Sequence, residues 1–229
     1  MARISSGIPG FDSLVQGGFK AGSVNLIAGN PGAGKTIFSI QFLLEGLKRG
    51  EPGLYVTFEE KKDKLYEDML SFGWDLAKYE NQGKFIFLEH TPEQVKKILV
   101  EGGGTVESLV HKLKAKRIVI DSITAFTLLY KDELTKKEAS LALFELISKW
   151  GCTAVMTSEA ENPAEDSLPA ALQFEVDSII ILYYTKRKGI RTRSLEVIKM
   201  RGTKHPLKTF ETEITPHGFV VYPQRLVKF

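Results

Sequence analysis

A glycine-rich turn in the first fifth of the chain carries the residue types that bind phosphate. Residues 29–36 read GNPGAGKT, which matches the pattern G-x-x-x-x-G-K-[ST]. Glycines at this spacing let backbone N–H groups converge on phosphate oxygens, while the lysine reaches the β and γ phosphates and the hydroxyl faces Mg²⁺. The pattern predicts a nucleotide-binding loop made of Asn30, Pro31, Gly32, Ala33, Gly34, Lys35, Thr36 and Ile37.

A carboxylate at the end of a second apolar run complements this loop. Residues 117–120 read RIVI and are followed by Asp121. A phosphate-binding loop needs a carboxylate at the end of another core strand to complete the magnesium shell. Taken alone, such a run is merely a strand that meets a turn. Together with the loop, it predicts that Thr36 and Asp121 hold Mg²⁺.

Two adjacent glutamates follow a third strand pattern. Glu59 and Glu60 come directly after residues 54–58, whose carboxyl end faces the phosphates if the sheet is parallel. A carboxylate there could orient or deprotonate water, so both residues are candidate catalytic groups beside Lys35. The alternative is a solvated pair that opens the next helix, where negative charge suits the helix dipole.

The carboxyl-terminal third of the chain is locally basic. Between Lys186 and Lys208 there are nine basic residues and one acidic residue, Glu196. Alternation along a strand directs Lys199 and Arg201 to the same side, and two adjacent cations suit a phosphate. From the residues alone the phosphate is not identified, and an exposed basic strand end is the alternative reading.

Strand and helix patterns alternate around these residues. We expect strands at 24–28, 54–58, 85–88, 118–121, 154–157 and 178–184, and helices at 36–48, 61–72, 106–113 and 135–150. This order predicts parallel pairing with helices on both faces. The later runs 193–200, 209–214 and 219–222 have no helix pattern between them and predict antiparallel strands. The fold class is therefore α/β, with a mostly parallel twisted sheet and antiparallel strands at its carboxyl-terminal end.

Two capping-box patterns predict where helices begin. Thr91 with Gln94, and Thr135 with Glu138, have the spacing at which the first side chain and the fourth exchange hydrogen bonds with each other's backbone. We therefore expect helix starts at Thr91 and at Thr135.

Composition excludes several classes of protein. The 229 residues are 43% hydrophobic and 26% charged, which excludes a disordered chain, a collagen-like repeat and a coiled-coil rod, and predicts one domain over 1–229. A net charge of +3 is too small to argue for nucleic-acid or membrane binding. One cysteine, Cys152, and the absence of a signal-peptide core or membrane-length apolar run predict a cytoplasmic protein.

Together these segments resemble the RecA-like P-loop ATPases and, within them, the single-domain KaiC-like ATPases. The loop corresponds to the Walker A motif and the strand that ends in Asp121 to Walker B. Further matching segments are 7–12 with 17–18, 57–60, 71–75, 156–159, 199–205 and 217–218. The resemblance implies a RecA-like fold and binding of ATP with Mg²⁺.

In that family ATP lies between neighbouring subunits of a hexameric ring. One subunit gives the P-loop and the next gives the K-x-R-G-[ST]-x-H segment, so the resemblance implies that Lys199 and Arg201 act in trans on the γ-phosphate. Glu59 would be the general base. Other positions that the resemblance places near the nucleotide are Met200, Thr203, His205, Ser71 and Thr215, the last beside Pro216 where the family has an acidic residue.

Three functions remain open at this point. The first is a regulatory ATPase ring of identical subunits that acts on protein partners. The second is a DNA-handling recombinase-like or helicase-like module, supported by the basic residues 186–193 but opposed by the acidic residues in the predicted channel loop 161–173. The third is a scaffold that binds ATP and barely hydrolyses it. Clock proteins of the family have two tandem units and autophosphorylation sites in a tail, so the resemblance by itself implies neither a clock function nor an autokinase cycle for this chain.

Overall fold

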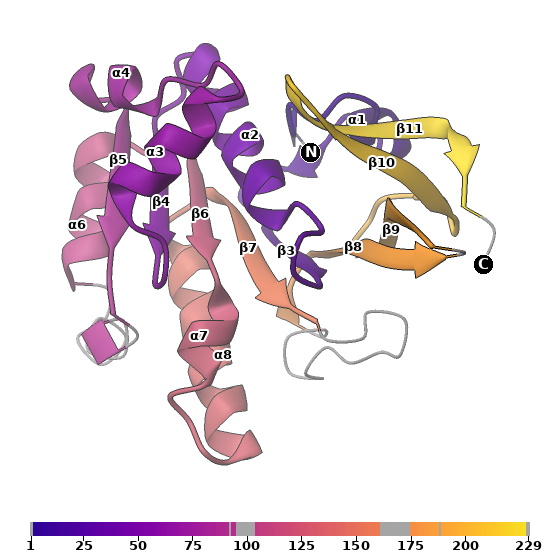
Figure 1. Cartoon of the computed structure of the whole chain (residues 1–229). Helices are drawn as coiled ribbons and strands as arrows, with labels where there is room; N and C mark the ends of the chain where they lie inside the picture. Colours follow the sequence, from indigo (N-terminus) through magenta and orange to yellow (C-terminus); the bar gives the residue numbers. More distant parts are fainter. Residues whose placement is uncertain (1, 92, 95–103, 161–174, 188, 228–229) are drawn as a thin grey trace.

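A twisted sheet runs through the protein, with helices packed against both of its faces (Figure 1). The computed structural model describes residues 2–91, 93–94, 104–160, 175–187 and 189–227. Within these ranges the main sheet has nine strands in the order β11-β10-β9-β8-β3-β7-β6-β4-β5. Their bounds are β3 (Val24–Gly29), β4 (Gly53–Thr57), β5 (Phe85–Glu89), β6 (Arg117–Asp121), β7 (Thr153–Glu159), β8 (Ser178–Arg187), β9 (Ile190–Met200), β10 (Thr209–Thr215) and β11 (Gly218–Leu226).

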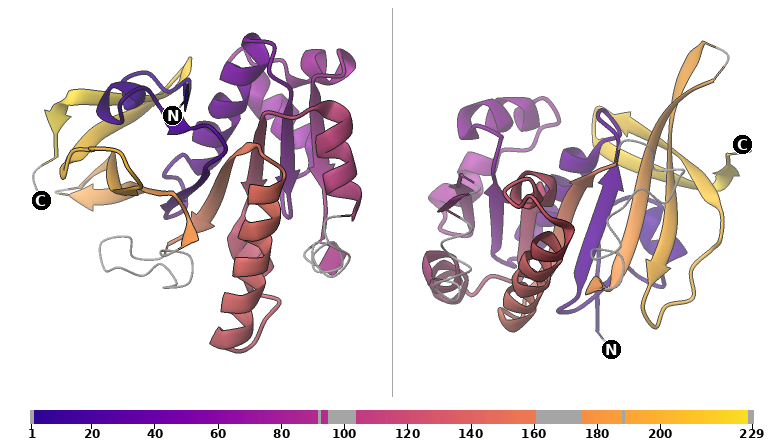
Figure 2. Two further views of the ribbon diagram at one scale, coloured as in Figure 1. Left: turned by 180° about the vertical axis from the view of Figure 1, so that it is seen from behind. Right: turned by 90° about the horizontal axis from the view of Figure 1, so that it is seen from below.

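The sheet divides into a parallel and an antiparallel part. Strands β5, β4, β6, β7, β3 and β8 pair in parallel, and β8, β9, β10 and β11 pair antiparallel. This confirms the predicted fold class. The carboxyl ends of the parallel strands lie at one edge, which is where α/β sheets bind ligands. The β8–β9 hairpin extends past that edge (Figure 2), since β3 pairs with β8 only as far as Leu182.

Helices on the two faces cover separate apolar clusters. One face packs against α1 (Phe11–Leu14), α2 (Lys35–Lys48), α3 (Lys62–Leu70) and α4 (Leu76–Asn81), and the other against α6 (Gly104–Leu113), α7 (Ile123–Thr127) and α8 (Glu133–Lys149). Strand alternation sorts the residues between them. Val119 and Val155 belong to the cluster with α2, whereas Ile118 and Ala154 belong to the cluster with α8.

Some short elements were not predicted. These are α1, α4, α7 and a two-stranded sheet of β1 (Arg3–Ile4) with β2 (Phe19–Lys20). The hydrophobic periods that indicate helices need more than the four residues of α1 or the five of α7. No helix of the described ranges is long and apolar enough to span a lipid bilayer.

The two capping-box predictions had different outcomes. At the first, the Thr91 N–H donates to Gln94 Oε1 at 2.7 Å and the Gln94 N–H donates to Thr91 Oγ1 at 3.4 Å, as predicted. The second was wrong, because α8 begins at Glu133 and Asp132 is its N-cap. Asp132 Oδ1 accepts the Thr135 N–H at 2.8 Å, and Oδ2 accepts the Thr135 hydroxyl at 2.6 Å. An ionised carboxylate accepts two donors here, so it outcompetes the hydroxyl three residues later.

This difference gives a direct test. We expect Asp132→Ala to lower the free energy of unfolding by about 1 kcal/mol, because it leaves an N-terminal N–H of α8 without its acceptor. Glu138→Ala, which removes the predicted partner of Thr135, should leave stability unchanged. Urea unfolding of both variants checks this; a larger loss in Glu138→Ala would restore Thr135 as the cap.

Candidate active site at the carboxyl edge of the sheet

The glycine-rich loop joins β3 to α2 at the carboxyl edge. Lys35 is the first residue of α2, and its Nζ donates to the carbonyl of Gly29 at 2.9 Å and to that of Asn30 at 3.4 Å. The side chain is therefore folded over the loop. Gly29 is required because a Cβ there would lie 2.3 Å from the carbonyl oxygen of Leu182. Gly34 has a φ of +103°, a conformation that favours glycine.

The β8–β9 hairpin holds the outer side of this loop. Asn30 Nδ2 donates to the carbonyl of Tyr184 at 2.8 Å, and the Tyr184 N–H donates to Asn30 Oδ1 at 2.9 Å. Arg193 Nε donates to the carbonyl of Gly32 at 2.9 Å while its guanidinium lies over the Tyr184 ring, 4.5 Å from the centroid. The loop is thus held by the backbone of β8 at Tyr184 and by the Arg193 side chain of β9, both more than 150 residues later in sequence.

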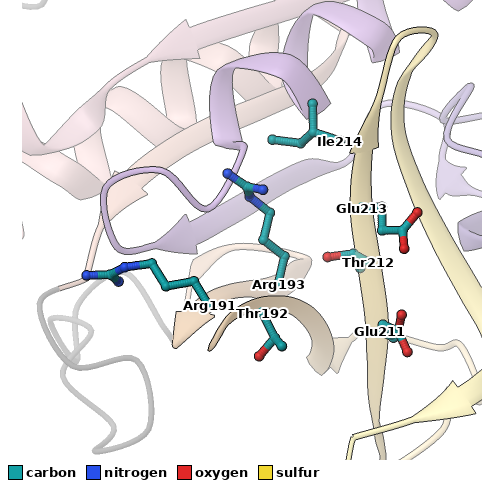
Figure 3. A pocket seen from close by; sticks show the side chains of 7 residues that line it. All are labelled: Arg191, Thr192, Arg193, Glu211, Thr212, Glu213 and Ile214. Carbon is teal, nitrogen blue, oxygen red and sulfur yellow. The ribbon is translucent and has the colours of Figure 1, made fainter. Parts of the chain in front are cut away.

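A pocket of about 240 Å³ opens between β9 and β10 beside the loop. Figure 3 shows the Arg193 side chain directed towards the loop and the start of α2, with Ile214 next to that helix. The pocket is lined by Arg191, Thr192, Arg193, Glu211, Thr212, Glu213 and Ile214. From the sequence, Arg193 was only one member of the basic stretch 186–193 that would favour DNA binding; the hairpin geometry brings it to the loop.

Asp121 lies at the end of β6 and is 8% exposed. Its Oδ2 accepts the hydroxyl of Thr36 at 2.9 Å and the phenol of Tyr55 at 2.7 Å, and its Oδ1 accepts the hydroxyl of Thr157 at 2.5 Å. Burial, and then the Asp121 charge, raise the pKa of Tyr55 well above its usual range, so the phenol stays protonated and donates. The predicted pair of Thr36 and Asp121 is therefore in direct contact.

Three carboxylates act electrostatically on the Lys35 ammonium. Burial lowers the pKa of Lys35, and three carboxylates act in the opposite direction, those of Glu159, Asp121 and Glu59. Burial also raises the pKa of Glu59, with further increases from Glu159, Asp121 and Glu60 and a decrease from Lys35. Glu59 and Glu60 both follow β4, and their N–H groups donate to Thr57 Oγ1 at 3.3 and 3.1 Å.

Glu159 is a residue of this cluster to which sequence analysis gave no role. It ends β7, where it is paired in register with Gly29 of the loop. A signal similar to the one at Asp121 was present, because Glu159 is an acidic residue two positions after the strand pattern at 154–157. Tyr55 and Thr157 were likewise given no role, although a phenol in an otherwise apolar covered strand requires a buried hydrogen-bond partner.

The basic segment lies at the opposite edge of the sheet. Met200 pairs with Ser178, at the start of β8, and the Arg201 N–H donates to the carbonyl of Asp177 at 2.8 Å. The Asp177 N–H in turn donates to Val24, the first residue of β3. Because β3 separates this point from the loop by about 17 Å, Lys199 and Arg201 are not brought to the loop of their own chain.

Local contacts order this segment. Burial and then repulsion by Arg201 lower the pKa of Lys199. Arg3 anchors the following turn, since its Nη2 donates to Thr203 Oγ1 at 2.7 Å and its Nη1 lies 3.9 Å from Met200 Sδ. His205 Nδ1 lies 3.3 Å from the carbonyl oxygen of Pro206.

Ser71 and Thr215 lie in two turns that meet beside α2. Ser71 ends α3 and donates to the Asp68 carbonyl at 2.6 Å, and Thr215 Oγ1 donates to the Gly218 carbonyl at 3.0 Å. Trp74, which follows Ser71, packs against the second turn so closely that a Cβ on Gly218 would lie 2.5 Å from its ring. The two predicted residues therefore share one region along α2.

Comparison with known proteins places this arrangement in a family. A family model described as "ATPase: KaiC" matches residues 4–226. The circadian clock protein KaiC3 of Synechocystis is 37% identical in an alignment of 230 positions that covers 96% of this chain and 46% of that protein. The chain thus spans less than half the length of that relative. A UPF0273 protein of Pyrococcus furiosus is 35% identical in an alignment of 239 positions that covers 99% of this chain and 96% of that protein.

A solved structure is equally similar. The crystal structure of a KaiC-like protein from the hyperthermophilic archaeon Pyrococcus horikoshii has a TM-score of 0.86 and 37% sequence identity, with 97% of this chain and 99% of that chain covered. Matches at this level over nearly the whole chain share both sequence and fold. The chain belongs to the KaiC family of ATPases.

Proposed function

We propose that this chain binds ATP with Mg²⁺ and hydrolyses it between two copies of itself in a ring. The observation that carries the proposal is the position of the two predicted halves of the site. The phosphate-binding loop follows Gly29 at one end of β3, and Lys199 to His205 lies beside Val24 at the other end. A single copy cannot bring both halves to one nucleotide, whereas a neighbouring copy placed head to tail can.

The loop half has the groups that a triphosphate needs. Its backbone N–H groups and the amino end of α2 suit phosphate oxygens, and Lys35 adds a positive charge. Thr36 and Asp121 fit Mg²⁺, because a hydroxyl and a carboxylate within 2.9 Å of each other offer the oxygen ligands that this ion prefers. Bound Mg²⁺ would supply charge stabilisation at the phosphates.

Glu59 is the proposed general base. Its pKa is raised by burial and by the neighbouring carboxylates, which increases its affinity for a proton. Water attacks the γ-phosphorus in line with the bond to ADP, its proton passes to the Glu59 carboxylate, and ADP leaves with phosphate as the second product. Lys35 from one copy, and Lys199 and Arg201 from the next, stabilise the charge on the transferred group.

The remaining predicted residues complete the interface. We propose that Ser71 and Thr215 lie near the adenosine on the loop side. Met200, Thr203 and His205 approach the same nucleotide from the neighbouring copy. A ring of six subunits closes all such contacts, and a cytoplasmic regulatory role with protein partners is the function that we assign to it.

Mixing two variants tests whether the halves act in trans. Glu59→Gln impairs the loop half and Arg201→Ala the other, and each alone should lose turnover, Arg201→Ala by roughly 10³-fold with ATP binding retained. When the two are mixed and reassembled, about a quarter of interfaces combine two intact halves, so phosphate release should recover to about a quarter of wild type.

Two controls fix the interpretation. Mixing Glu59→Gln with Lys35→Ala should give no recovery, because both changes lie on the loop half. Arg225→Ala should keep wild-type turnover, because it removes only an ion pair between Arg225 of β11 and Glu211 of β10. If the mixture of Glu59→Gln with Arg201→Ala shows no recovery, under conditions where mixed assemblies are shown to form, the site is not shared between copies.

DNA handling is the competing function, and one surface favours it. The β8–β9 hairpin extends beyond the sheet edge (Figure 2). Its paired residues Lys186 and Arg191 are both exposed. The predicted channel loop 161–173 lies outside the described residues. We expect no binding of single-stranded DNA at micromolar protein and low salt, measured by fluorescence anisotropy; salt-sensitive binding would favour the DNA-handling function instead.

A further inference from the structure

We infer that the Tyr55 hydroxyl is a positioning group that holds Asp121 in the orientation used for Mg²⁺. The inference rests on the proposed function, since it concerns the same Mg²⁺-ATP site. It assigns a task to Tyr55 of β4, whose hydroxyl bonds the proposed Mg²⁺ ligand Asp121.

The sheet geometry brings the two residues together. Tyr55 is paired in register with Val119, and Thr57 with Asp121, so alternation directs Tyr55 and Asp121 to the α2 face. The Tyr55 side chain is fully buried. Its hydroxyl donates to Asp121 Oδ2 at 2.7 Å.

The phenol is also held rigidly. The Tyr55 ring stacks on Phe87 from the neighbouring strand β5, with centroids 5.5 Å apart and an interplanar angle of 16°. Its hydroxyl therefore has little freedom to move away from the carboxylate. A donor fixed in this way keeps its geometry without a further entropy cost when a ligand binds.

Asp121 is held on its two oxygens by different strands. Thr157 of β7 donates to Oδ1, and Tyr55 of β4 donates to Oδ2, which also accepts the Thr36 hydroxyl. If Mg²⁺ is bound, the Thr36 oxygen would face the ion through a lone pair while its hydroxyl proton still donates to Oδ2, so the position of the carboxylate also fixes Thr36. Tyr55 donates to the same oxygen from a fully buried ring, and it would keep the carboxylate from turning when the ion is held.

Burial alone could also explain the contact, since a buried phenol needs an acceptor. The two explanations differ in what Tyr55→Phe changes. If the pair only satisfies burial, the variant loses stability but keeps its Mg²⁺ requirement. If Tyr55 positions Asp121, the variant needs more Mg²⁺ to bind ATP.

The experiment measures ATP binding by calorimetry across a Mg²⁺ titration, and again in EDTA. In Tyr55→Phe we expect the half-saturating Mg²⁺ concentration to rise about 10-fold or more, with binding in EDTA unchanged. Tyr66→Phe is the matched control, since the Tyr66 hydroxyl donates to Glu80 at 3.1 Å and its removal deletes the same atom elsewhere. That control should keep the wild-type Mg²⁺ titration.

Each outcome decides between two claims. Wild-type protein that binds ATP without any Mg²⁺ dependence, or not at all, contradicts the proposed function and with it this inference. If wild type and Tyr55→Phe show the same clear Mg²⁺ dependence, the role of Tyr55 is overturned and the proposed function stands. If Tyr55→Phe does not fold, 4-fluorophenylalanine at position 55 fills the phenol's space without an O–H and carries the same expectation.

Discussion

One buried carboxylate constrains the centre of the molecule. Asp121 is almost inaccessible to water, and a buried charge is tolerated only when donors replace its hydration. The donors come from β4, β7 and the start of α2, so this single group requires three elements to meet in one arrangement. The glycine-rich loop lies between β3 and α2 and takes its position from the same junction. Any shift of β4 against β6 would remove the Tyr55 donor and leave Oδ2 with the Thr36 hydroxyl alone.

A second set of contacts links α2 to the carboxyl-terminal strands. Gln41, in the middle of α2, donates to the carbonyl of Gly7 at 2.9 Å and accepts the Phe219 N–H at 2.8 Å. At the loop before α2, Asn30 exchanges two hydrogen bonds with Tyr184. The phosphate-binding loop is therefore bonded to β8, and the helix that follows it is bonded to β11. A displacement of α2 would therefore break or shift its hydrogen bond to β11 in the antiparallel part of the sheet.

The sequence allowed the parallel core and the loop to be predicted, because both depend on short-range patterns. It was less informative where a result depends on residues distant in the chain. Tyr55 read only as an apolar strand residue, since its acceptor lies 66 residues later. Glu159 lay in a segment that resembles the family, 156–159, but nothing in its spacing tied it to the loop, because their contact depends on the pairing of β7 with β3. The error at Thr135 was local: two adequate caps stood three residues apart, and the carboxylate of Asp132 binds more strongly than the hydroxyl. The residue roles in the site stay predictions.

The separation of the loop from the Lys199 segment by the length of β3 has a consequence for how activity depends on assembly. If each copy carries two unlike halves at opposite edges, a linear row of copies always ends in one unmatched half at each end. Only a closed arrangement leaves none unmatched. Dilution would then reduce the turnover per chain more strongly than it reduces the binding of nucleotide to the loop. The fraction of complete sites would depend on how many assemblies are closed. The turnover per chain would therefore change with the concentration of the chain.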